Sequence, residues 1–236
     1  AGNIVIDGHC EASQIEAGGD VIIRKGCQGK GLGKIIAGKS IVGQFFESAV
    51  LTAGKDVQAT YLLNCQLKAN GKLLVEGRKG VIIGGKTCAK LGVSCNGIGN
   101  IAEIATVVSV GIDKEDMTAY QELQKKIEQT QAELQTCENG LNKLMANPVH
   151  DEKVSMMIQR LTRAVYTLKS SRKELFSERD AQMEQMTKQK EARIQVSGRV
   201  YPGTLLFLNE DPFAIKEIYN NVEFVKHDNR IDTLAH

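Results

Sequence analysis

Two stretches of the chain match GxxxxGK[ST], the pattern of a glycine-rich loop that holds nucleotide phosphates. They are Gly33-Lys-Ile-Ile-Ala-Gly-Lys-Ser40 and Gly80-Val-Ile-Ile-Gly-Gly-Lys-Thr87. Such a loop needs a strand before it and a helix after it, because amides at the helix N-terminus hold the phosphate. Ser40 leads instead into the β-branched pair Ile41-Val42. We therefore predict corners of a Gly/Lys-rich repeat at both places, and no cofactor.

Histidines and cysteines could supply metal ligands, or a nucleophile with its base. The histidines have no ligand spacing and no visible cysteine or carboxylate partner, so we expect surface residues: His9, His150, His227 and His236. The cysteines contain no CxxC pair, so we expect small, reduced core residues: Cys10, Cys27, Cys65, Cys88, Cys95 and Cys137. We predict no catalytic residue and no metal site, and reduced thiols are typical of a cytoplasmic protein.

Charged residues could form a carbohydrate site, since carbohydrate-active β-helix enzymes group acids with Arg or Lys on one wall. Asp20 and Asp56 lie at equivalent positions beside a turn, where a carboxylate can accept backbone amides. The basic residues near turns are either solvated corners or a stripe for an acidic partner: Lys30, Lys34, Lys39, Lys55, Lys72, Arg78, Lys79 and Lys86. We favour the structural use of aspartate and the solvated corners. Three or more exposed carboxylates and bases on one wall would favour a carbohydrate site.

A short repeat determines the fold that must position all these residues. Its form is apolar, any residue, Ala, a two-residue Gly-rich turn, polar, apolar. Five copies are Ile15-Glu-Ala-Gly-Gly-Asp-Val21, Ile35-Ile-Ala-Gly-Lys-Ser-Ile41, Leu51-Thr-Ala-Gly-Lys-Asp-Val57, Leu67-Lys-Ala-Asn-Gly-Lys-Leu73 and Thr87-Cys-Ala-Lys-Leu-Gly-Val93. The short β-branched runs between the turns cannot bury an apolar face alone. Stacked coils can, with strands about 4.8 Å apart.

The spacing of the copies indicates which kind of parallel β-solenoid to expect. The alanines fall at 17, 37, 53, 69 and 89, so the intervals are 20, 16, 16 and 20 residues. This excludes a strict hexapeptide period and favours a right-handed β-helix. We expect the extra residues in two Gly-rich excursions, 26–33 and 77–80. The corner glycines are expected to have φ > 0, with Asn70 replacing one of them.

After Gly111 the apolar period changes to that of a coiled coil. The first seam has the spacing 3-4-3-4-3-4-3: Tyr120, Leu123, Ile127, Thr130, Leu134, Cys137, Leu141 and Leu144. Asp113 is the expected N-cap, and the pattern stops around Asn147-Pro148, as helices do before proline. Gly140 could kink this helix, at a cost of roughly 1 kcal/mol relative to Ala.

The second seam consists of Val154, Ile158, Leu161, Val165, Leu168, Arg172, Leu175, Arg179, Gln182 and Met186. Two long helices joined by a short loop should lie antiparallel. The polar residues at its end indicate either a frayed, solvated base or docking onto the solenoid, and we favour the first. The tail resumes β character at Ile194–Val200, Thr204–Leu208 and Val222–Val225. It could add a coil or cap the open end.

These motifs, in this order, resemble the bacterial flagellar assembly protein A family. The segments that carry the resemblance are Gly77-Arg-Lys-Gly-Val-Ile-Ile-Gly-Gly85, Val110-Gly-Ile-Asp113 before the coiled coil, and Val200-Tyr-Pro-Gly203 after it. The resemblance implies a bacterial cytoplasmic β-helix with a coiled-coil insertion and a non-catalytic role in flagellar assembly or polar organisation. It implies no functional residues. It also implies a further N-terminal domain in relatives, and the start at Ala1-Gly2-Asn3 without methionine agrees with an excised piece.

The sequence therefore predicts a right-handed parallel β-helix interrupted by a long antiparallel coiled-coil hairpin. We expect the β-helix at 1–112, the hairpin at 113–191, and C-terminal strands at 192–236 that complete or cap the β-helix. Lys and Arg number 30 against 28 acids, and no apolar run approaches the ~20 residues of a membrane span. We expect a scaffold with protein partners, no nucleic acid and no membrane span. It could self-associate through solenoid ends or the hairpin; the alternative is a carbohydrate-binding or polysaccharide-active β-helix.

Overall fold

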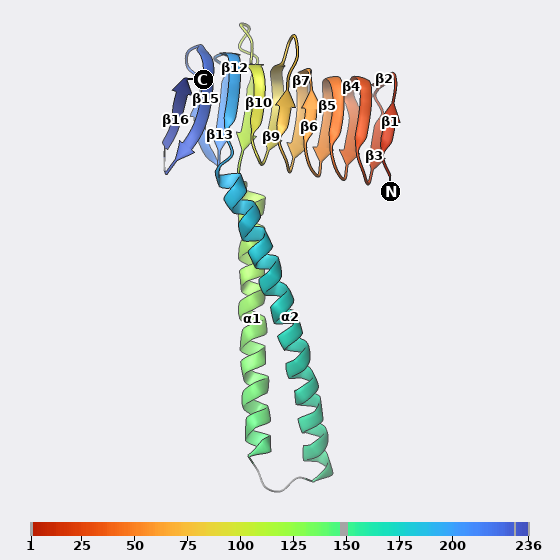
Figure 1. Ribbon diagram of the computed structural model, residues 1–236, viewed down its shortest axis with the longest axis vertical. Helices are drawn as coiled ribbons and strands as arrows, with labels where there is room; N and C mark the ends of the chain where they lie inside the picture. Colours follow the sequence, from red (N-terminus) through yellow and green to blue (C-terminus); the bar gives the residue numbers. More distant parts are fainter. Residues whose placement is uncertain (1, 147–150, 229, 236) are drawn as a thin grey trace. The chain divides into compact units, whose positions relative to one another are not determined.

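The computed structural model describes residues 2–146, 151–228 and 230–235. The chain divides into two compact units, and each is described by itself. The first unit combines Ala1–Asp113 with Thr187–His236, and the second consists of Lys114–Met186. The first is mainly β and the second is a pair of helices (Figure 1).

Strands of the first unit lie on both sides of the helical insertion in the sequence. Those before it are β1 (Ile4–Ile6), β2 (His9–Glu11), β3 (Gln14–Ala17), β4 (Val21–Ala37), β5 (Ile41–Ala53), β6 (Val57–Ala59), β7 (Tyr61–Ala69), β8 (Leu73–Val75), β9 (Val81–Ala89), β10 (Val93–Ile98) and β11 (Thr106–Val110). Those after it are β12 (Ile194–Val200), β13 (Thr204–Leu208), β14 (Asp211–Ala214), β15 (Tyr219–His227) and β16 (Arg230–Ala235). All of these strands belong to one continuous sheet.

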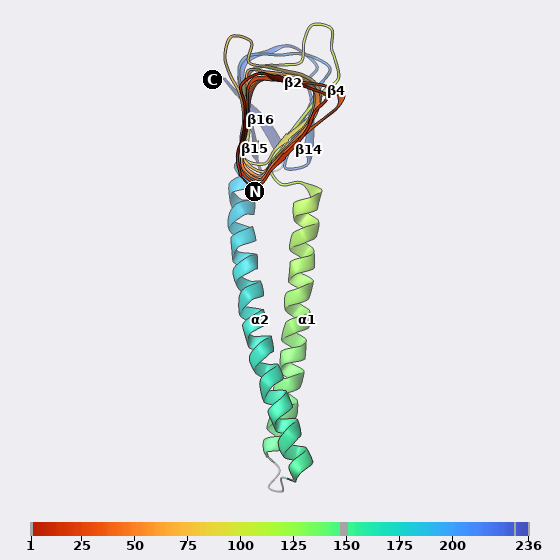
Figure 2. The ribbon, with the colours of Figure 1, turned by 90° about the vertical axis from the view of Figure 1, so that its right-hand side faces the viewer.

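The coils stack in parallel and in register, as the repeat predicts. Successive alanines pair directly, Ala17 with Ala37, Ala37 with Ala53, Ala53 with Ala69, and Ala69 with Ala89. Seen along the stack, the coils superpose into a closed outline (Figure 2). The β-solenoid is therefore confirmed, and its right-handed winding stays a prediction.

Each complete coil contributes three walls, and each wall has an inward column of large or medium side chains. On the first wall the column is Val21, Ile41, Val57, Leu73 and Val93. On the second wall it is Cys27, Phe46, Leu62, Ile82 and Ile98, and on the third it is Ile35, Leu51, Leu67, Thr87 and Val108. None of these residues is more than 3% exposed, so the core is a closed stack of apolar columns.

The glycines of the first corner, which joins the third wall to the next coil, are needed for close approach. We expected positive φ angles there, but neither Gly38, Gly54 nor Asn70 has one. A Cβ on Gly54 would lie 2.2 Å from the carbonyl oxygen of Gly38, and a Cβ on Gly38 would lie 2.4 Å from that of Gly18. The backbone of the preceding coil thus occupies the space of a side chain. The φ prediction was wrong for Gly38, Gly54 and Asn70, whereas Gly92 and Gly111, at the same corner of later coils, do have positive φ angles of 121° and 88°.

Positive φ angles recur at the second corner, between the second and third walls. Ala12, Ser48 and Asn64 have φ of 44°, 48° and 49°, and Gly84 has 68°. Each directly follows a residue of one in-register column, which runs through Glu11, Gln28, Glu47, Leu63 and Ile83. Three of these four residues are not glycine, so a search for glycines in the sequence could not locate this corner.

The two predicted excursions differ from each other. Residues 77–80 form a loop between β8 and β9, as expected. Residues 26–33 lie within the long strand β4, where the register with β5 shifts between Ile23 and Gly26 and again between Gln28 and Gly33. Cys27 keeps its place in the second wall, so only the residues around Lys30 are extra.

The C-terminal strands both extend the solenoid and cap it. β12 and β13 pair in parallel with β10 and β11, so they continue the first and third walls. β14, β15 and β16 then pair antiparallel, which ends the stack. Three rings of these last strands pack together, with centroids of Phe213 and Phe224 at 5.6 Å and those of Tyr219 and Phe224 at 5.8 Å. Large aromatic side chains close the end of a core that elsewhere holds mainly Val, Ile, Leu and Ala.

The second unit is the predicted helical hairpin. α1 spans Lys114–Met145 and α2 spans Glu152–Lys190, so α2 ends within the first unit. Every residue of the predicted seams is buried or half-buried, with Leu123, Ile127 and Leu134 fully buried. Asn147, Pro148 and His150 lie outside the described residues. The Glu138 carboxylate accepts the Lys169 ammonium at 2.8 Å across the two helices.

The polar end of the second seam is helical, so fraying is excluded, while a solvated base and docking onto the solenoid both stay predictions. Arg172, Arg179 and Gln182 are half-buried and α2 continues beyond them. The Arg179 guanidinium lies 4.7 Å from the centre of the Phe176 ring and 2.7 Å from the Asp180 carboxylate. Long basic side chains can cover apolar surface with their methylene groups, so a polar seam still packs.

Gly54→Ala is expected to lower the free energy of unfolding of the solenoid by about 1–3 kcal/mol, because the new Cβ overlaps the Gly38 carbonyl. Gly140→Ala is the matched control. A Cβ there would lie 3.7 Å from Leu161 Cδ1, so this change should stabilise α1 by up to ~1 kcal/mol. Denaturant unfolding followed by circular dichroism measures both. Equal stability of Gly54→Ala and the parent chain would contradict the close-approach argument.

Candidate functional site

Neither match to the phosphate-binding pattern has the geometry of a phosphate loop. Residues 33–40 run from β4 across the first corner to the start of β5, and residues 80–87 lie mainly in β9. The corner amides are already used, because Gly38 N–H donates to Ala17 O at 2.8 Å and Lys39 N–H donates to Gly19 O at 3.1 Å. These stretches are repeat corners, as predicted.

Asp20 and Asp56 hold successive coils together at the first corner. Asp20 Oδ1 accepts the Ser40 amide at 3.0 Å, and Asp56 Oδ1 accepts the Lys72 amide at 2.7 Å. Asn3 occupies the same column, and its Oδ1 accepts the Asp20 amide at 2.8 Å. The structural role predicted for these carboxylates is confirmed, with the amide supplied by the next coil.

The eight basic residues named from the sequence do not form one stripe. Lys39 and Lys55 lie on the first corner, and Lys30 lies near the second. Lys34 and Lys86 share a column of the third wall, but Val50 and Gln66 lie between them. Several have local partners: Lys30 pairs with Glu11 at 2.7 Å, and Lys79 Nζ lies 5.0 Å from the centre of the Tyr61 ring. The set is therefore spread over several parts of the solenoid.

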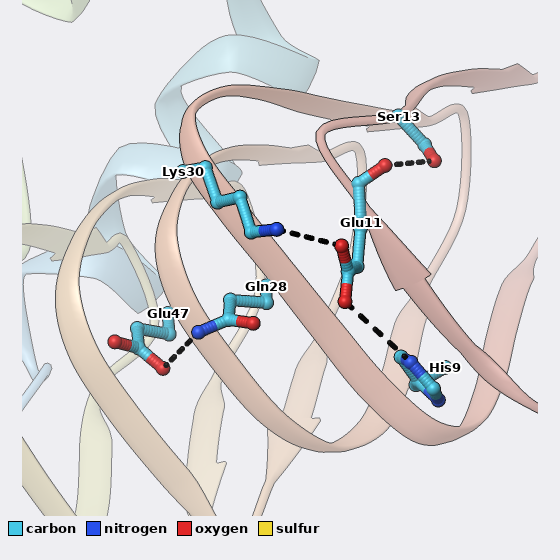
Figure 3. A network of polar contacts seen from close by, with 6 residues as sticks. All are labelled: His9, Glu11, Ser13, Gln28, Lys30 and Glu47. Atoms are coloured by element: carbon cyan, nitrogen blue, oxygen red, sulfur yellow. Dashed lines mark hydrogen bonds and ion pairs between the residues drawn. The ribbon is translucent and has the colours of Figure 1, made fainter.

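The outer surface of the second wall carries a polar network in its first coils (Figure 3). Glu11 accepts Lys30 at 2.7 Å and lies 3.8 Å from His9, while Gln28 donates to Glu47 at 3.4 Å. The Lys30 ammonium lowers the pKa of Glu11, so this carboxyl stays ionised at neutral pH. A glycosidase acid needs the opposite shift. The network can bind polar groups, and it has the acids and bases on one wall that a carbohydrate site requires.

Both described histidines have carboxylate neighbours that the sequence did not reveal. His9 lies on the same side of β2 as Glu11, and His227 Nδ1 lies 3.2 Å from Asp232 Oδ2 across the β15–β16 pair. Both rings are more than half exposed. The expectation of surface histidines is confirmed for these two. His150 and His236 lie outside the described residues.

The cysteines are reduced, and most are core residues. Cys10, Cys27, Cys65 and Cys95 are buried, whereas Cys88 and Cys137 are half-buried. Burial raises the pKa of Cys27 to about 11 and that of Cys95 to about 12. Because the thiolate is the reactive form, these thiols are protected both sterically and electrostatically.

Alkylation of the native chain with iodoacetamide at pH 8 should therefore modify Cys88 and Cys137 first. At that pH only about one in a thousand Cys27 thiols would be ionised. In denaturant all six cysteines should react at similar rates. Mass spectrometry after digestion locates the adducts. Rapid native labelling of Cys27 or Cys95 would show that the solenoid core opens readily.

The helical insertion replaces one corner of the repeat. Val110 pairs with Ala89 on one side and Leu208 on the other, so Gly111 begins a first corner like that after each alanine. The chain returns at Arg193, whose carbonyl accepts the Val93 amide at 3.0 Å, as the Gly92 carbonyl accepts that of Leu73. A sixth copy of the repeat is thus split by the hairpin.

Asn209 joins the two ends of this split corner. Its Oδ1 accepts the Ile112 amide at 2.9 Å, and its Nδ2 donates to the Lys190 carbonyl at 3.2 Å. Its φ of 50° is one that asparagine tolerates better than most residues. Asp113 directly follows Ile112, and its Oδ2 lies 3.8 Å from Lys90 Nζ. Its role as N-cap stays a prediction, although α1 does begin directly after it.

Asn209→Gly should loosen this junction, because Gly keeps the positive φ but removes both side-chain hydrogen bonds. We expect the Ile112 amide to exchange with deuterium roughly 10–100-fold faster, and the free energy of unfolding to fall by about 1–2 kcal/mol. Asn70→Gly is the control, since Asn70 follows Ala69 as Asn209 follows Leu208, at the same corner three coils earlier. Equal exchange at Ile112 in the two variants would contradict the role of Asn209.

A recess of about 620 Å³ adjoins the returning chain in the first unit. Its basic lining residues are Lys72, Lys188 and Arg193, and its acidic one is Glu191. Arg193 already pairs with Glu223 at 3.0 Å. The described residues contain no group of three or more His, Cys, Asp or Glu that could hold a metal ion. Within the same residues, neither helix has the length and hydrophobicity needed to cross a bilayer.

A family model described as the Flagellar Assembly Protein A beta solenoid domain matches residues 1–231. The chain belongs to this family. The resemblance inferred from the order of motifs is thereby confirmed. No curated protein and no solved structure matched the chain. Membership connects it with flagellar assembly, and its own residues must indicate how it acts.

Proposed function

We propose that the chain is a non-catalytic scaffold of the bacterial cytoplasm, linked to flagellar assembly or polar organisation and acting through protein partners. The family membership supports the link with assembly. The observation that carries the scaffold role is the hairpin, which replaces a corner of the repeat and leaves large apolar side chains exposed. These are Met117, Met145, Met156, Met157, Tyr166 and Met183. Exposed methionines on a helical surface are typical of protein-binding sites.

A scaffold also needs a rigid support, and the solenoid is suited to provide it. Its coils are bound to one another by continuous parallel ladders and by the Asp20 and Asp56 carboxylates. The C-terminal antiparallel strands end the stack with an aromatic cluster. A support of this kind keeps its surfaces in fixed positions without a ligand.

Replacing residues 114–186 with a short Gly-Ser turn tests the proposal. We expect the solenoid to fold, since the insertion lies in a corner, and we expect the variant to fail to restore motility or polar structures in a host lacking the gene. Circular dichroism and thermal unfolding establish that the variant is folded. Full restoration by a folded variant would remove the hairpin from the function.

A carbohydrate-binding wall is the second candidate, and the polar network of the second wall favours it. Glu11, Glu47 and Gln28 lie in one outward column with Lys30 and His9 beside them. Affinity electrophoresis in gels containing peptidoglycan fragments or acidic polysaccharides would retard the parent chain. Glu47→Gln with Gln28→Ala should abolish the retardation. Identical mobility with and without polysaccharide would reject this candidate.

A further inference from the structure

The hairpin has a groove between its helices that is lined mainly by small and apolar side chains. The groove has a volume of about 670 Å³. α1 contributes Ala132, Thr136 and Cys137, together with Glu133 at its rim, and α2 contributes Ala164, Thr167 and Leu168. Both Cys137 and Leu168 belong to the seams, so the groove reaches the contact line of the two helices. Small side chains leave room for a third element to approach both backbones.

Charge is strongly segregated between the two helices at this level. Residues 132–143 of α1, which lie opposite residues 160–169 of α2, carry two acids and one base, whereas residues 160–169 carry three bases and no acid. Only the Glu138–Lys169 pair joins the two sets within the described residues. In these facing segments four bases stand against two acids, so two positive charges have no acidic counterpart.

Two of the surplus bases share a helix face with the groove. Arg160 precedes Ala164 by four residues and Arg163 precedes Thr167 by four, which places each pair on one face. Among the residues that the structure describes, neither arginine has an ion-pair partner. Met157, seven residues before Ala164, lies on the same face and is 55% exposed. The groove thus continues into an apolar and cationic surface.

We propose that this groove binds an acidic amphipathic helix of a partner protein, whose apolar side chains enter the groove and whose carboxylates pair with Arg160 and Arg163. The inference rests on the scaffold function and names its partner class. A helix is the element that fits, because grooves between antiparallel helices accept an apolar stripe at i, i+3, i+4 and i+7. A second copy of the chain fits less well. It would bring the same surplus of positive charge, and two-fold pairing would leave most arginines and lysines without an acid.

The test uses two fluorescein-labelled synthetic peptides of about three heptads. Both have leucine at the core positions; one has glutamate at the flanking positions and the other lysine. Fluorescence anisotropy with the full chain should show saturable binding of the glutamate peptide and at least about tenfold weaker binding of the lysine peptide. Equal binding of the two would overturn the proposal.

Charge-reversal variants locate the peptide on the hairpin. Arg160→Glu should weaken binding of the glutamate peptide about fivefold or more, whereas Lys173→Glu should change it less than about twofold. Lys173 shares a face with Tyr166 and Lys169 rather than with Ala164, so it is a control with the same change in net charge. Equal effects of the two variants would indicate unspecific attraction and would overturn the proposal.

Alkylation gives a second readout that does not depend on a variant folding correctly. The bound peptide should slow modification of Cys137, which lines the groove, and leave the rate at Cys88 on the solenoid unchanged. Light scattering should give one chain per peptide. A dimer whose Cys137 is protected without peptide would make a second copy the occupant and overturn the proposal. Failure to bind the peptide, while hairpin-dependent rescue of motility persists, would reject this inference and leave the scaffold function standing.

Discussion

The spacing between stacked coils, about 4.8 Å, is the constraint on which the rest of this solenoid depends. Each coil leaves its amides and carbonyls to be satisfied by its neighbours, so every corner must stack as closely as every wall. At the first corner this closeness removes the side chain, and Gly38 and Gly54 each lie over a carbonyl of the preceding coil. The same closeness lets Asp20 and Asp56 reach an amide of the following coil. The antiparallel cap is the remaining consequence, because a stack of this kind has to end on strands that expose few unpaired groups.

Much of the fold could be predicted because close stacking selects small residues at fixed positions of each coil, and these residues are visible in the sequence. The alanine positions alone give the register of the coils, and the heptads give both helices. The split copy at Val110 and Arg193 could not be recognised, since its halves lie far apart in the sequence and lack the Ala-Gly signature. Gly38 and Gly54 were expected at a corner because of positive φ, and that reason was wrong. Glycine serves both positive φ and close approach, and only the stacked backbone tells which applies.

The surfaces were less predictable than the core, for a physical reason. A partner across strands, such as Asp232 beside His227, depends on a register that no local pattern encodes. The charge segregation of the hairpin is visible in the sequence, but its meaning depends on which bases face the groove. The polar end of the second seam shows the same limit, because the residue type alone does not tell whether an arginine is half-buried or fully solvated. Sequence patterns of this type predict which residues form the core, whereas contacts between surface side chains depend on the three-dimensional structure.

The split corner at Gly111 and Arg193 also has a consequence for how such proteins can change. The chain leaves and re-enters the solenoid at neighbouring points, held by Asn209, so the inserted segment adds little loop-closure entropy to the folding of the coils. Gly54 and Gly71 lie at the same corner in other coils, each donating its amide to the coil before it. The solenoid is therefore a ready acceptor for grafted modules. A hairpin moved to the corner at Gly54 or Gly71, or exchanged here for an unrelated helical pair, would present a new surface without redesign of the core.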